Sequence, residues 1–212
     1  MKIVIFGANG SVGKILTQQA VTQGHQTRAV TRHPETFPIR GDGLEVMRGD
    51  VLVPSDVAQA VEGQEVVLSL FGVPYTFKPV SVYSQGMAHI LDAMRASGVR
   101  RLVCVTSGGT NPRHDPDEGF VFGWIMKPLF GRTLYADMRR MEDLVMHSDR
   151  DWTIVRPARL VDTPTVTAYH VHEGYMVQGV RETSRADLAD FMLKQAGATQ
   201  YIHKAVAVAT SR

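Results

Sequence analysis

The sequence predicts an α/β fold in which a doubly wound parallel sheet carries helices on both faces. As far as residue 155, short apolar segments alternate with segments whose apolar residues recur every three or four positions. Residues 101–106 form an almost continuous apolar run, as in parallel strands that are buried on both faces. A strand-to-helix order of this kind forms a parallel sheet, because each helix carries the chain back to the edge where the next strand starts.

The first half of the chain contains four predicted strands and two predicted helices. The first helix has Val12, Ile15, Leu16 and Ala20 on one face and ends near Gly24. Pro54 and Ser55 open a short helix that continues through Val61, since proline suits the first turn of a helix. The strands are expected at Ile3–Phe6, Thr27–Thr31, Leu44–Met47 and Glu65–Leu70.

The second half continues the alternation with two more strands. The next helix carries Met87, Ile90, Leu91 and Met94 on one face and is closed by Gly98. The strand Arg101–Thr106 follows, and the strand Trp152–Val155 comes after another helix. The apolar face of that helix consists of Leu134, Met138, Met141 and Val145.

Residues 158–212 are expected to form a small extension on the substrate side of the sheet. They contain the strand-like segments Val166–Val171 and Tyr175–Val177, a helix around Asp187–Lys194 and a last strand, Ala205–Ala209. Additions after the sixth strand of such a sheet usually wall a substrate pocket at the carboxyl ends of the strands. We therefore expect one domain, residues 1–212, to which this extension belongs.

The composition is that of an ordinary globular chain. With 212 residues, 44% hydrophobic and 21% charged, it can bury one core but is short for two. The net charge is only +2 and no basic stripe alternates with aromatics, so nucleic acid is not an expected partner. The single Cys104 is expected in the core and fits a reducing compartment. No signal region precedes Ile3 and no apolar run approaches the ~18 residues of a membrane span, which predicts a cytoplasmic protein without membrane contact. We expect a monomer or a homodimer.

Three glycines spaced three residues apart link the first strand to the first helix. Gly7 would let the chain turn sharply off the strand, Gly10 would let backbone amides approach phosphate oxygens, and Gly13 would let the helix pack closely. This pattern is typical of a Rossmann-type fold that binds a dinucleotide. The expected pyrophosphate-binding residues are Gly7, Asn9, Gly10, Ser11, Val12 and Gly13. A glycine-rich turn that holds no ligand is the alternative.

The end of the second strand indicates which dinucleotide is preferred. Sites that favour NAD tend to place an acid there, about 20 residues past the glycines, whereas a 2′-phosphate needs a cation. Here the strand ends in Val30-Thr31-Arg32-His33, and the Arg32 guanidinium suits a phosphate. We therefore expect NADP(H) to be preferred. Glu35 lies close enough in sequence to keep NAD(H) open, and Arg32 as a merely solvated charge is the alternative interpretation.

The chain resembles the atypical short-chain dehydrogenases/reductases, and among them the NmrA-like and biliverdin reductase B (flavin reductase) proteins. The resemblance runs over nearly the whole length and is specific for the group but not for a substrate. The matching segments are Ile5-Phe6-Gly7-Ala8-Asn9-Gly10 with Gly13, Val30-Thr31-Arg32, Gly49-Asp50-Val51, Ser97-Gly98-Val99, Val105-Thr106-Ser107, Asp151-Trp152-Thr153-Ile154-Val155-Arg156-Pro157 and Ser184-Arg185-Ala186-Asp187-Leu188.

The resemblance implies further cofactor-binding residues. Asp50 and Val51 would lie by the adenine, although a turn-forming Gly-Asp pair is nearly as good an interpretation. Leu70, Phe71 and Gly72 would lie along the nicotinamide ribose. Thr106 and the loop after Arg156-Pro157 would complete the site on the nicotinamide side.

The catalytic residues are less evident. The large short-chain family pairs a Tyr with a Lys four residues on, but no Tyr here has a Lys at that spacing, and Tyr135 is followed by Arg139. The resemblance implies that Ser107 lies beside the nicotinamide and the substrate, with a loop-capping serine as the alternative. Arg159 stands where the biliverdin reductase B type places a His, and it offers a cation for an acidic substrate.

The segment Thr110–Arg132 is expected to form a lid over the carboxyl ends of the strands. It contains Phe120, Phe122, Trp124, Met126, Leu129 and Phe130, separated by Gly119, Gly123, Pro128 and Gly131. Such side chains could stack against a flat ring, and a dimer contact or a covered core edge is the alternative. His114, Asp115, Asp117 and Glu118, and the pair His170 and His172, lack a closed ligand spacing, so no metal site is predicted.

Two functions remain in view. The first is an NADPH-dependent reductase that transfers a hydride to a flat acceptor such as a flavin or quinone, for which positioning matters more than a Tyr-Lys pair. The second is an NmrA-like module that senses NADP(H) without turnover. The aromatic lid and Ser107 favour the reductase, and the missing Tyr-Lys pair weakens a third alternative, an epimerase or lyase.

Overall fold

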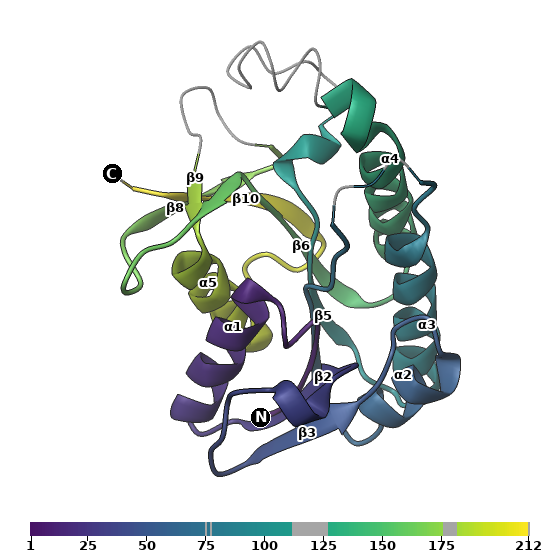
Figure 1. Ribbon diagram of the computed structural model, residues 1–212, viewed down its shortest axis with the longest axis vertical. Helices are drawn as coiled ribbons and strands as arrows, with labels where there is room; N and C mark the ends of the chain where they lie inside the picture. The colour runs from purple at the N-terminus through teal and green to yellow at the C-terminus, as the bar shows by residue number, and fades with distance from the viewer. Residues whose placement is uncertain (75, 77, 112–126, 176–181, 212) are drawn as a thin grey trace.

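The computed structural model describes residues 1–74, 76, 78–111, 127–175 and 182–211. Its centre is an eight-stranded sheet with the order β3-β2-β1-β4-β5-β6-β10-β8 (Figure 1). All neighbouring strands are parallel except β8, which runs antiparallel to β10. These strands are β1 Lys2–Phe6, β2 Gln26–Thr31, β3 Leu44–Arg48, β4 Val66–Ser69, β5 Arg101–Val105, β6 Asp151–Pro157, β8 Tyr169–Glu173 and β10 Lys204–Thr210. The predicted doubly wound α/β fold is confirmed.

Helices cover both faces of this sheet. Helices α1 (Ser11–Thr22) and α5 (Arg185–Gly197) lie on one face, and α2 (Pro54–Val61), α3 (Val82–Ala96) and α4 (Lys127–Met146) lie on the other (Figure 1). Two short 3₁₀ helices, η1 (Pro34–Thr36) and η2 (Gly108–Thr110), follow the carboxyl ends of β2 and β5.

The alternation of side chains along β1 explains the two cores. Ile3 and Ile5 pack with α1 and α5, whereas Val4 and Phe6 pack with α2, α3 and α4, because successive residues of a strand point to opposite faces. All four side chains are fully buried. Cys104 on β5 is buried in the core that contains Val4 and Phe6, which confirms its predicted packing role. This burial raises the pKa of its thiol well above the ordinary value.

The order of the strands reverses at β1, and in open parallel sheets such a reversal is where a crevice is expected. From β3 the chain crosses over β2 and β1 to form β4 on the other side of β1, so the loops after β1 and β4 leave in opposite directions. Parallel strands bring the loops that follow β1, β2, β3, β4, β5 and β6 to the same edge of the sheet. In sheets of this kind ligands bind at that edge.

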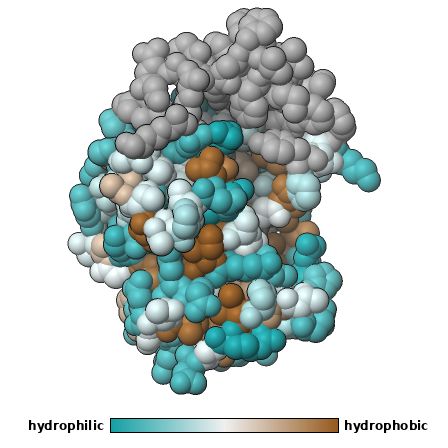
Figure 2. Space-filling model, turned by 60° about the vertical axis from the view of Figure 1, so that its left-hand side comes forward, coloured by the Kyte–Doolittle hydropathy of each residue, from teal (hydrophilic) through white to brown (hydrophobic). Residues whose placement is uncertain are grey.

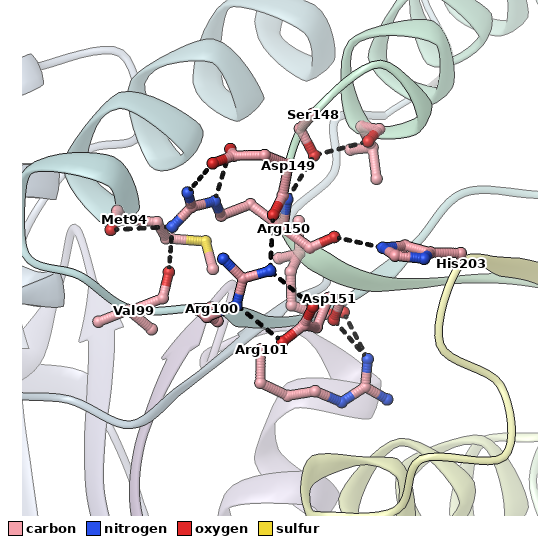
Figure 3. A network of polar contacts seen from close by, with 11 residues as sticks. Met94, Val99, Arg100, Arg101, Ser148, Asp149, Arg150, Asp151 and His203 are labelled. Carbon is pink, nitrogen blue, oxygen red and sulfur yellow. Dashed lines mark hydrogen bonds and ion pairs between the residues drawn. The ribbon is translucent and has the colours of Figure 1, made fainter.

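Buried arginines close the opposite edge. Arg101 donates from Nε and Nη2 to the Gln195 carbonyl, at 2.9 and 2.7 Å, near the C-terminus of α5. Arg150 donates from Nη1 to the Val99 carbonyl, at 2.8 Å, just beyond α3 (Figure 3). Burial lowers the pKa of Arg101 to about 10, but its donors are satisfied by carbonyl oxygens. Cations at helix C-termini are favourable, so these residues stabilise the edge that is remote from the crevice.

The chain after β6 differs from the sequence prediction. The strand expected at Val166–Val171 is instead β8, Tyr169–Glu173, because Thr167 is tied to the buried Asp187 carboxylate through its amide (2.7 Å) and its hydroxyl (2.8 Å). Of the strand expected at Tyr175–Val177, Tyr175 lies in a bend and the other two residues are outside the described part. A second, two-stranded parallel sheet was not predicted; it pairs β7 (Arg159–Val161) with β9 (Glu182–Ser184).

The predicted lid lies largely outside the described residues. Phe120, Phe122, Trp124 and Met126 fall in the segment 112–126, of which nothing is described. Leu129 and Phe130 belong to α4, so this end of the lid is helix and not loop. Helix α4 therefore begins before the apolar face predicted from Leu134 onward, and Pro128 lies in its first turn, where proline is tolerated.

Six large apolar side chains are exposed among the described residues. No described helix has the length and apolar character needed to cross a membrane. On the face in Figure 2, apolar side chains reach the surface in separate patches divided by polar ones. The most exposed large apolar side chains are Met1, Leu52, Val53, Leu144, Met146 and Val166.

Candidate functional site

The turn between β1 and α1 depends on two glycines that have no room for a side chain. Gly7 has a φ of +86°, and a Cβ there would lie 2.6 Å from the Phe71 amide nitrogen. A Cβ on Gly13 would lie 2.2 Å from the Gly7 carbonyl oxygen. Gly10 differs, because the nearest atom to its Cβ would be the Gly7 oxygen at 3.2 Å. Gly7 and Gly13 thus serve the packing of the loop, and the side of Gly10 is left for something else to approach.

The N-terminus of α1 points into the crevice without a side-chain cap. Gly10 is the N-cap, and its carbonyl accepts the first helical hydrogen bond, from Lys14 at 3.0 Å. The amides of Ser11, Val12 and Gly13 precede that bond and have no partner in their own helix. The buried Asn9 Oδ1 also lacks a hydrogen-bond partner among the described residues. Since Oδ1 is an acceptor, a phosphate oxygen would have to be bound by the side-chain NH2 group of Asn9 instead. A helix end of this kind attracts anions, so the loop fits a pyrophosphate.

The carboxyl ends of β2 and β3 place two arginines side by side. The side chain of Arg32 is exposed, and its carbonyl accepts a hydrogen bond of 2.9 Å from Arg48 Nη1. Arg48 Nη2 also lies 3.0 Å from Glu35, whose other oxygen is 3.3 Å from His33 Nδ1. The pKa of the Glu35 carboxyl is lowered, chiefly by a backbone hydrogen bond and further by Arg48. Glu35, the acid that left NAD(H) binding as an alternative, therefore already interacts with Arg48 and His33.

Sequence reasoning missed Arg48, although a signal for it existed. Arg48 ends the strand that pairs with β2, and the register places it opposite Thr31. Residues that end adjacent parallel strands meet at one edge, so a cation at the end of the third strand could have been assigned to the same place as Arg32.

The loops after β3 and β4 pack against each other. Asp50 Oδ1 accepts from the Leu52 amide at 3.0 Å, which is the turn-forming interaction considered from the sequence. A Cβ on Gly86 of α3 would lie 3.0 Å from the Phe71 ring and 3.1 Å from Val51, so this glycine lets both side chains approach the helix. Phe71 also stacks on Tyr83, with ring centroids 6.1 Å apart. The backbone of Leu70 and Phe71 lies against Gly7, since a Cβ on Gly7 would be 2.8 Å from the Leu70 carbonyl oxygen and 2.6 Å from the Phe71 nitrogen. A Cβ on the next residue, Gly72, would lie 3.3 Å from Tyr83 Oη.

The loops after β5 and β6 are also adjacent. A Cβ on Gly108 would lie 3.3 Å from the Pro157 carbonyl oxygen. Ser107 Oγ accepts from the Gly109 amide at 3.1 Å and so caps η2, which agrees with the loop-capping alternative. Tyr135 is buried, and its ring would be only 2.5 Å from a Cβ on Gly109. Its sequence partner Arg139 donates to the Thr110 carbonyl at 3.5 Å.

A buried carboxylate on α4 connects the end of β6 to the loop after β5, and the sequence did not indicate it. Glu142 of α4, 3% exposed, accepts from Arg156 Nη2 at 2.8 Å and from Arg156 Nε at 3.0 Å. It also accepts from the hydroxyls of Thr106 (2.6 Å) and Thr110 (3.2 Å). The side chain of Thr106, expected at the cofactor, is therefore directed to the interior. Burial acts to lower the pKa of Arg156, but hydrogen bonding to Glu142 and its charge outweigh this and raise it.

Arg159 is already paired. It stands opposite Glu182 in the β7–β9 register and forms an ion pair with that carboxylate, while its side chain stays exposed. The loop after Pro157 is held by a hydrogen bond of 2.9 Å from the Ala158 amide to the Thr183 hydroxyl. Within the described residues no group of three or more His, Cys, Asp or Glu could hold a metal ion; His114, Asp115, Asp117 and Glu118 lie outside them.

The chain is similar in sequence to several known proteins. An uncharacterized chloroplastic protein of Arabidopsis thaliana is 29% identical over 177 residues, which cover 77% of this chain and 60% of the plant protein. A 2-alkyl-3-oxoalkanoate reductase of Stenotrophomonas maltophilia is 32% identical over 125 residues, which cover 56% of this chain and 37% of the reductase. The chain thus spans less than two thirds of the length of either relative.

The fold has close counterparts among solved structures. A wide-type short-chain dehydrogenase/reductase from Veillonella parvula, solved in complex with NADP, matches with a TM-score of 0.80 over 98% of this chain and 93% of its own, at 21% identity. Residues 7–199 match a family model described as NAD(P)H-binding. Since this match includes the glycine turn and both halves of the sheet, the chain belongs to the NAD(P)H-binding family of Rossmann-fold proteins.

Proposed function

We propose that the protein is an NADPH-dependent reductase that transfers a hydride to a flat, electron-poor acceptor such as a flavin or a quinone. The observation that carries the proposal is the absence of a Tyr-Lys pair together with the burial of Tyr135 against Gly109, which does not suit the proton exchange that alcohol–ketone chemistry needs. A flat acceptor needs chiefly to be held face to face with the nicotinamide. Family membership and the likeness to a reductase support an oxidoreductase role.

The residues around the crevice have separate roles in this proposal. Asn9 and the amides of Ser11, Val12 and Gly13 would hold the pyrophosphate, and Arg32 would bind the 2′-phosphate. Asp50 and Val51 would border the adenine, and Leu70–Gly72 the ribose on the nicotinamide side. When bound, the cofactor supplies a hydride. The backbone beside Pro157 and Ser107 would hold the two rings in place, and solvent would supply the proton that completes the reduction.

The preference for NADPH should be visible in the variant Arg32→Ala. Removing the charge-assisted hydrogen bonds of the guanidinium is expected to weaken NADPH binding on the order of 1.5–3 kcal/mol, which is a tenfold loss or more. NADH binding should hardly change because NADH has no 2′-phosphate. Calorimetric titration of wild type and variant with both dinucleotides measures this, and equal losses for the two would show that Arg32 does not bind the 2′-phosphate.

The reaction itself is tested by steady-state oxidation of NADPH with a panel of flavins and quinones. The wild type should turn over, and Ser107→Ala should lower kcat about threefold to tenfold without abolishing activity, because one hydrogen bond is lost while the ring positioning persists. Tyr135→Phe serves as the matched control and should change kcat little. Tight NADPH binding with oxidation no faster than the solution background would contradict the reductase proposal.

The second candidate is a module that senses NADP(H) without turnover. It is favoured by the engagement of both expected catalytic groups: Ser107 caps η2, and Arg159 pairs with Glu182. A sensor would show cofactor-dependent capture of a protein partner. If the acceptor panel shows no turnover, a pull-down with and without NADP(H) tests the sensor function.

A further inference from the structure

Arg185, the first residue of α5, reaches the N-terminus of α1 although it lies 174 positions later in the chain. Its Nε donates to Ser11 Oγ at 3.2 Å, and its Nη1 lies 2.8 Å from the Asp162 carboxylate. The side chain of Arg185 is 24% exposed, whereas that of Asp162 is 84% exposed. A guanidinium is thus held between the phosphate-binding end of one helix and a carboxylate at the surface.

This placement is built by contacts that do not involve the guanidinium. Helices α1 and α5 lie side by side on one face of the sheet (Figure 1), and Gln19 of α1 donates to the Ala186 carbonyl at 3.4 Å. Ser184 caps α5 by accepting from the amides of Ala186 (3.1 Å) and Asp187 (3.4 Å). The backbone of Arg185 is therefore fixed whatever its side chain binds.

The two partners of Arg185 are weak competitors for its charge. Ser11 is neutral, and an exposed ion pair such as that with Asp162 contributes at most about 1 kcal/mol. A pyrophosphate carries two negative charges and accepts the parallel N–H donors of a guanidinium in a bidentate arrangement. An anion bound at the N-terminus of α1 would lie within reach of a side chain that already contacts the first residue of that helix.

We propose that Arg185 is a pyrophosphate-binding residue of the dinucleotide site, and that Asp162 holds its guanidinium in place until the cofactor displaces that carboxylate. The inference rests on the cofactor binding in the proposed function but not on the acceptor or on turnover. It assigns the pyrophosphate a cation from the C-terminal extension in addition to the amides of α1. It also predicts that Arg185 contributes equally to NADPH and NADH, in contrast with Arg32.

The first experiment measures binding by the full-length protein and its Arg185→Ala variant. We expect a loss of about tenfold or more for both NADPH and NADH, because charge-assisted hydrogen bonds to the pyrophosphate are removed. Displacement of NADPH by ADP-ribose, which contains the pyrophosphate, should weaken in the same proportion. Displacement by 2′-AMP, which lacks it, should not change.

Arg95→Ala is the matched control. Arg95 is an exposed arginine in the last turn of α3 that pairs with Asp92, and it lies toward the opposite edge of the sheet. This variant removes the same charge and should leave all four affinities unchanged. Thermal unfolding of both variants tests whether the fold is retained. We expect it to be retained in Arg185→Ala because Ser184 caps α5.

The role of Asp162 is tested by Asp162→Asn. Removal of the carboxylate frees the guanidinium and removes a repulsive charge, so both dinucleotides should bind about twofold to fivefold more tightly, a gain of the size of an exposed ion pair. In the background Arg185→Ala this gain should shrink. A weaker affinity in Asp162→Asn would contradict the displacement of this carboxylate by the cofactor.

Failure of the inference and failure of the proposed function have different results. Unchanged dinucleotide affinities in Arg185→Ala, or equal losses for ADP-ribose and 2′-AMP, would overturn the inference even if the protein reduces flavins. If the wild type shows no turnover but Arg185→Ala still loses affinity for both dinucleotides, the reductase proposal is overturned and the inference is supported.

Discussion

Replacing Gly13 with alanine is expected to lower the free energy of unfolding by about 3 kcal/mol, the upper end of what an overpacked interior usually costs. The added Cβ would lie 2.2 Å from the Gly7 carbonyl oxygen and 2.7 Å from that of Ala8. Both contacts are with backbone, so the helix has to move away from the loop. Alanine favours a helix by about 1 kcal/mol over glycine, which offsets only part of this cost. Urea denaturation followed by circular dichroism measures the difference.

Gly10 provides the matched control for Gly13. Its φ is −67°, and a Cβ would meet only the Gly7 oxygen at 3.2 Å, so Gly10→Ala should stay within about 1 kcal/mol of the wild type. The larger variant Gly10→Val should keep the fold and lose dinucleotide affinity, since its side chain stands where the pyrophosphate approaches. Unchanged titration of NADPH with Gly10→Val would contradict the pyrophosphate assignment. An unchanged urea midpoint for Gly13→Ala would contradict the packing argument.

Replacing Glu142 with alanine is expected to destabilise the protein by about 3–5 kcal/mol, because the charge of Arg156 would stay buried without its partner. The Arg156 side chain is 8% exposed and makes two hydrogen bonds to this carboxylate. The hydroxyls of Thr106 and Thr110 would lose an acceptor as well. Denaturant unfolding measures the loss, and the exposed neighbour Asp143→Ala should change stability by less than about 0.5 kcal/mol.

The double variant Glu142→Met with Arg156→Met separates burial of an unpaired charge from loss of packing. It should recover much of the stability lost in Glu142→Ala, because no charge remains in the interior. The kcat of the double variant should nevertheless lie below that of the wild type, since Thr106 and Thr110 flank Ser107 and would no longer be tied to α4. Equal instability of the single and double variants would contradict the role of the unpaired arginine.

Arg156 also links the core to the segment that follows β8. Its guanidinium lies 4.0 Å from the centroid of the Tyr175 ring and donates to the Gly174 carbonyl at 3.3 Å. One buried ion pair thus joins α4, the loop that carries Ser107 and the segment that follows β8. The proposed reductase would require such rigidity for catalysis by positioning, because several loops together would hold a flat acceptor.

The sequence by itself determined the class of fold and the place of the glycine turn between β1 and α1. Hydrophobic periodicity located the strands and helices through β6, since burial on one or both faces dictates a repeat that needs no knowledge of partners. The spacing of Gly7, Gly10 and Gly13 marked the turn because two of the positions are restricted locally: Gly7 has a positive φ, and a Cβ on Gly13 would clash with the Gly7 carbonyl oxygen. A Cβ on Gly10 would meet only the Gly7 oxygen, at 3.2 Å. The cation at Arg32 followed from its place at the end of a strand.

Only the tertiary structure decided which side chains meet across long separations. The pairing of Arg185 with Ser11 and of Arg159 with Glu182 depends on how the extension folds. The pairing of Glu142 with Arg156 depends on the packing of α4 against β6. The start of β8 likewise depends on Asp187, which holds Thr167 in a loop, and not on the propensities of residues 166–168. Local sequence patterns specify elements because those depend on near neighbours, whereas the polar contacts that complete the site are set by packing between elements.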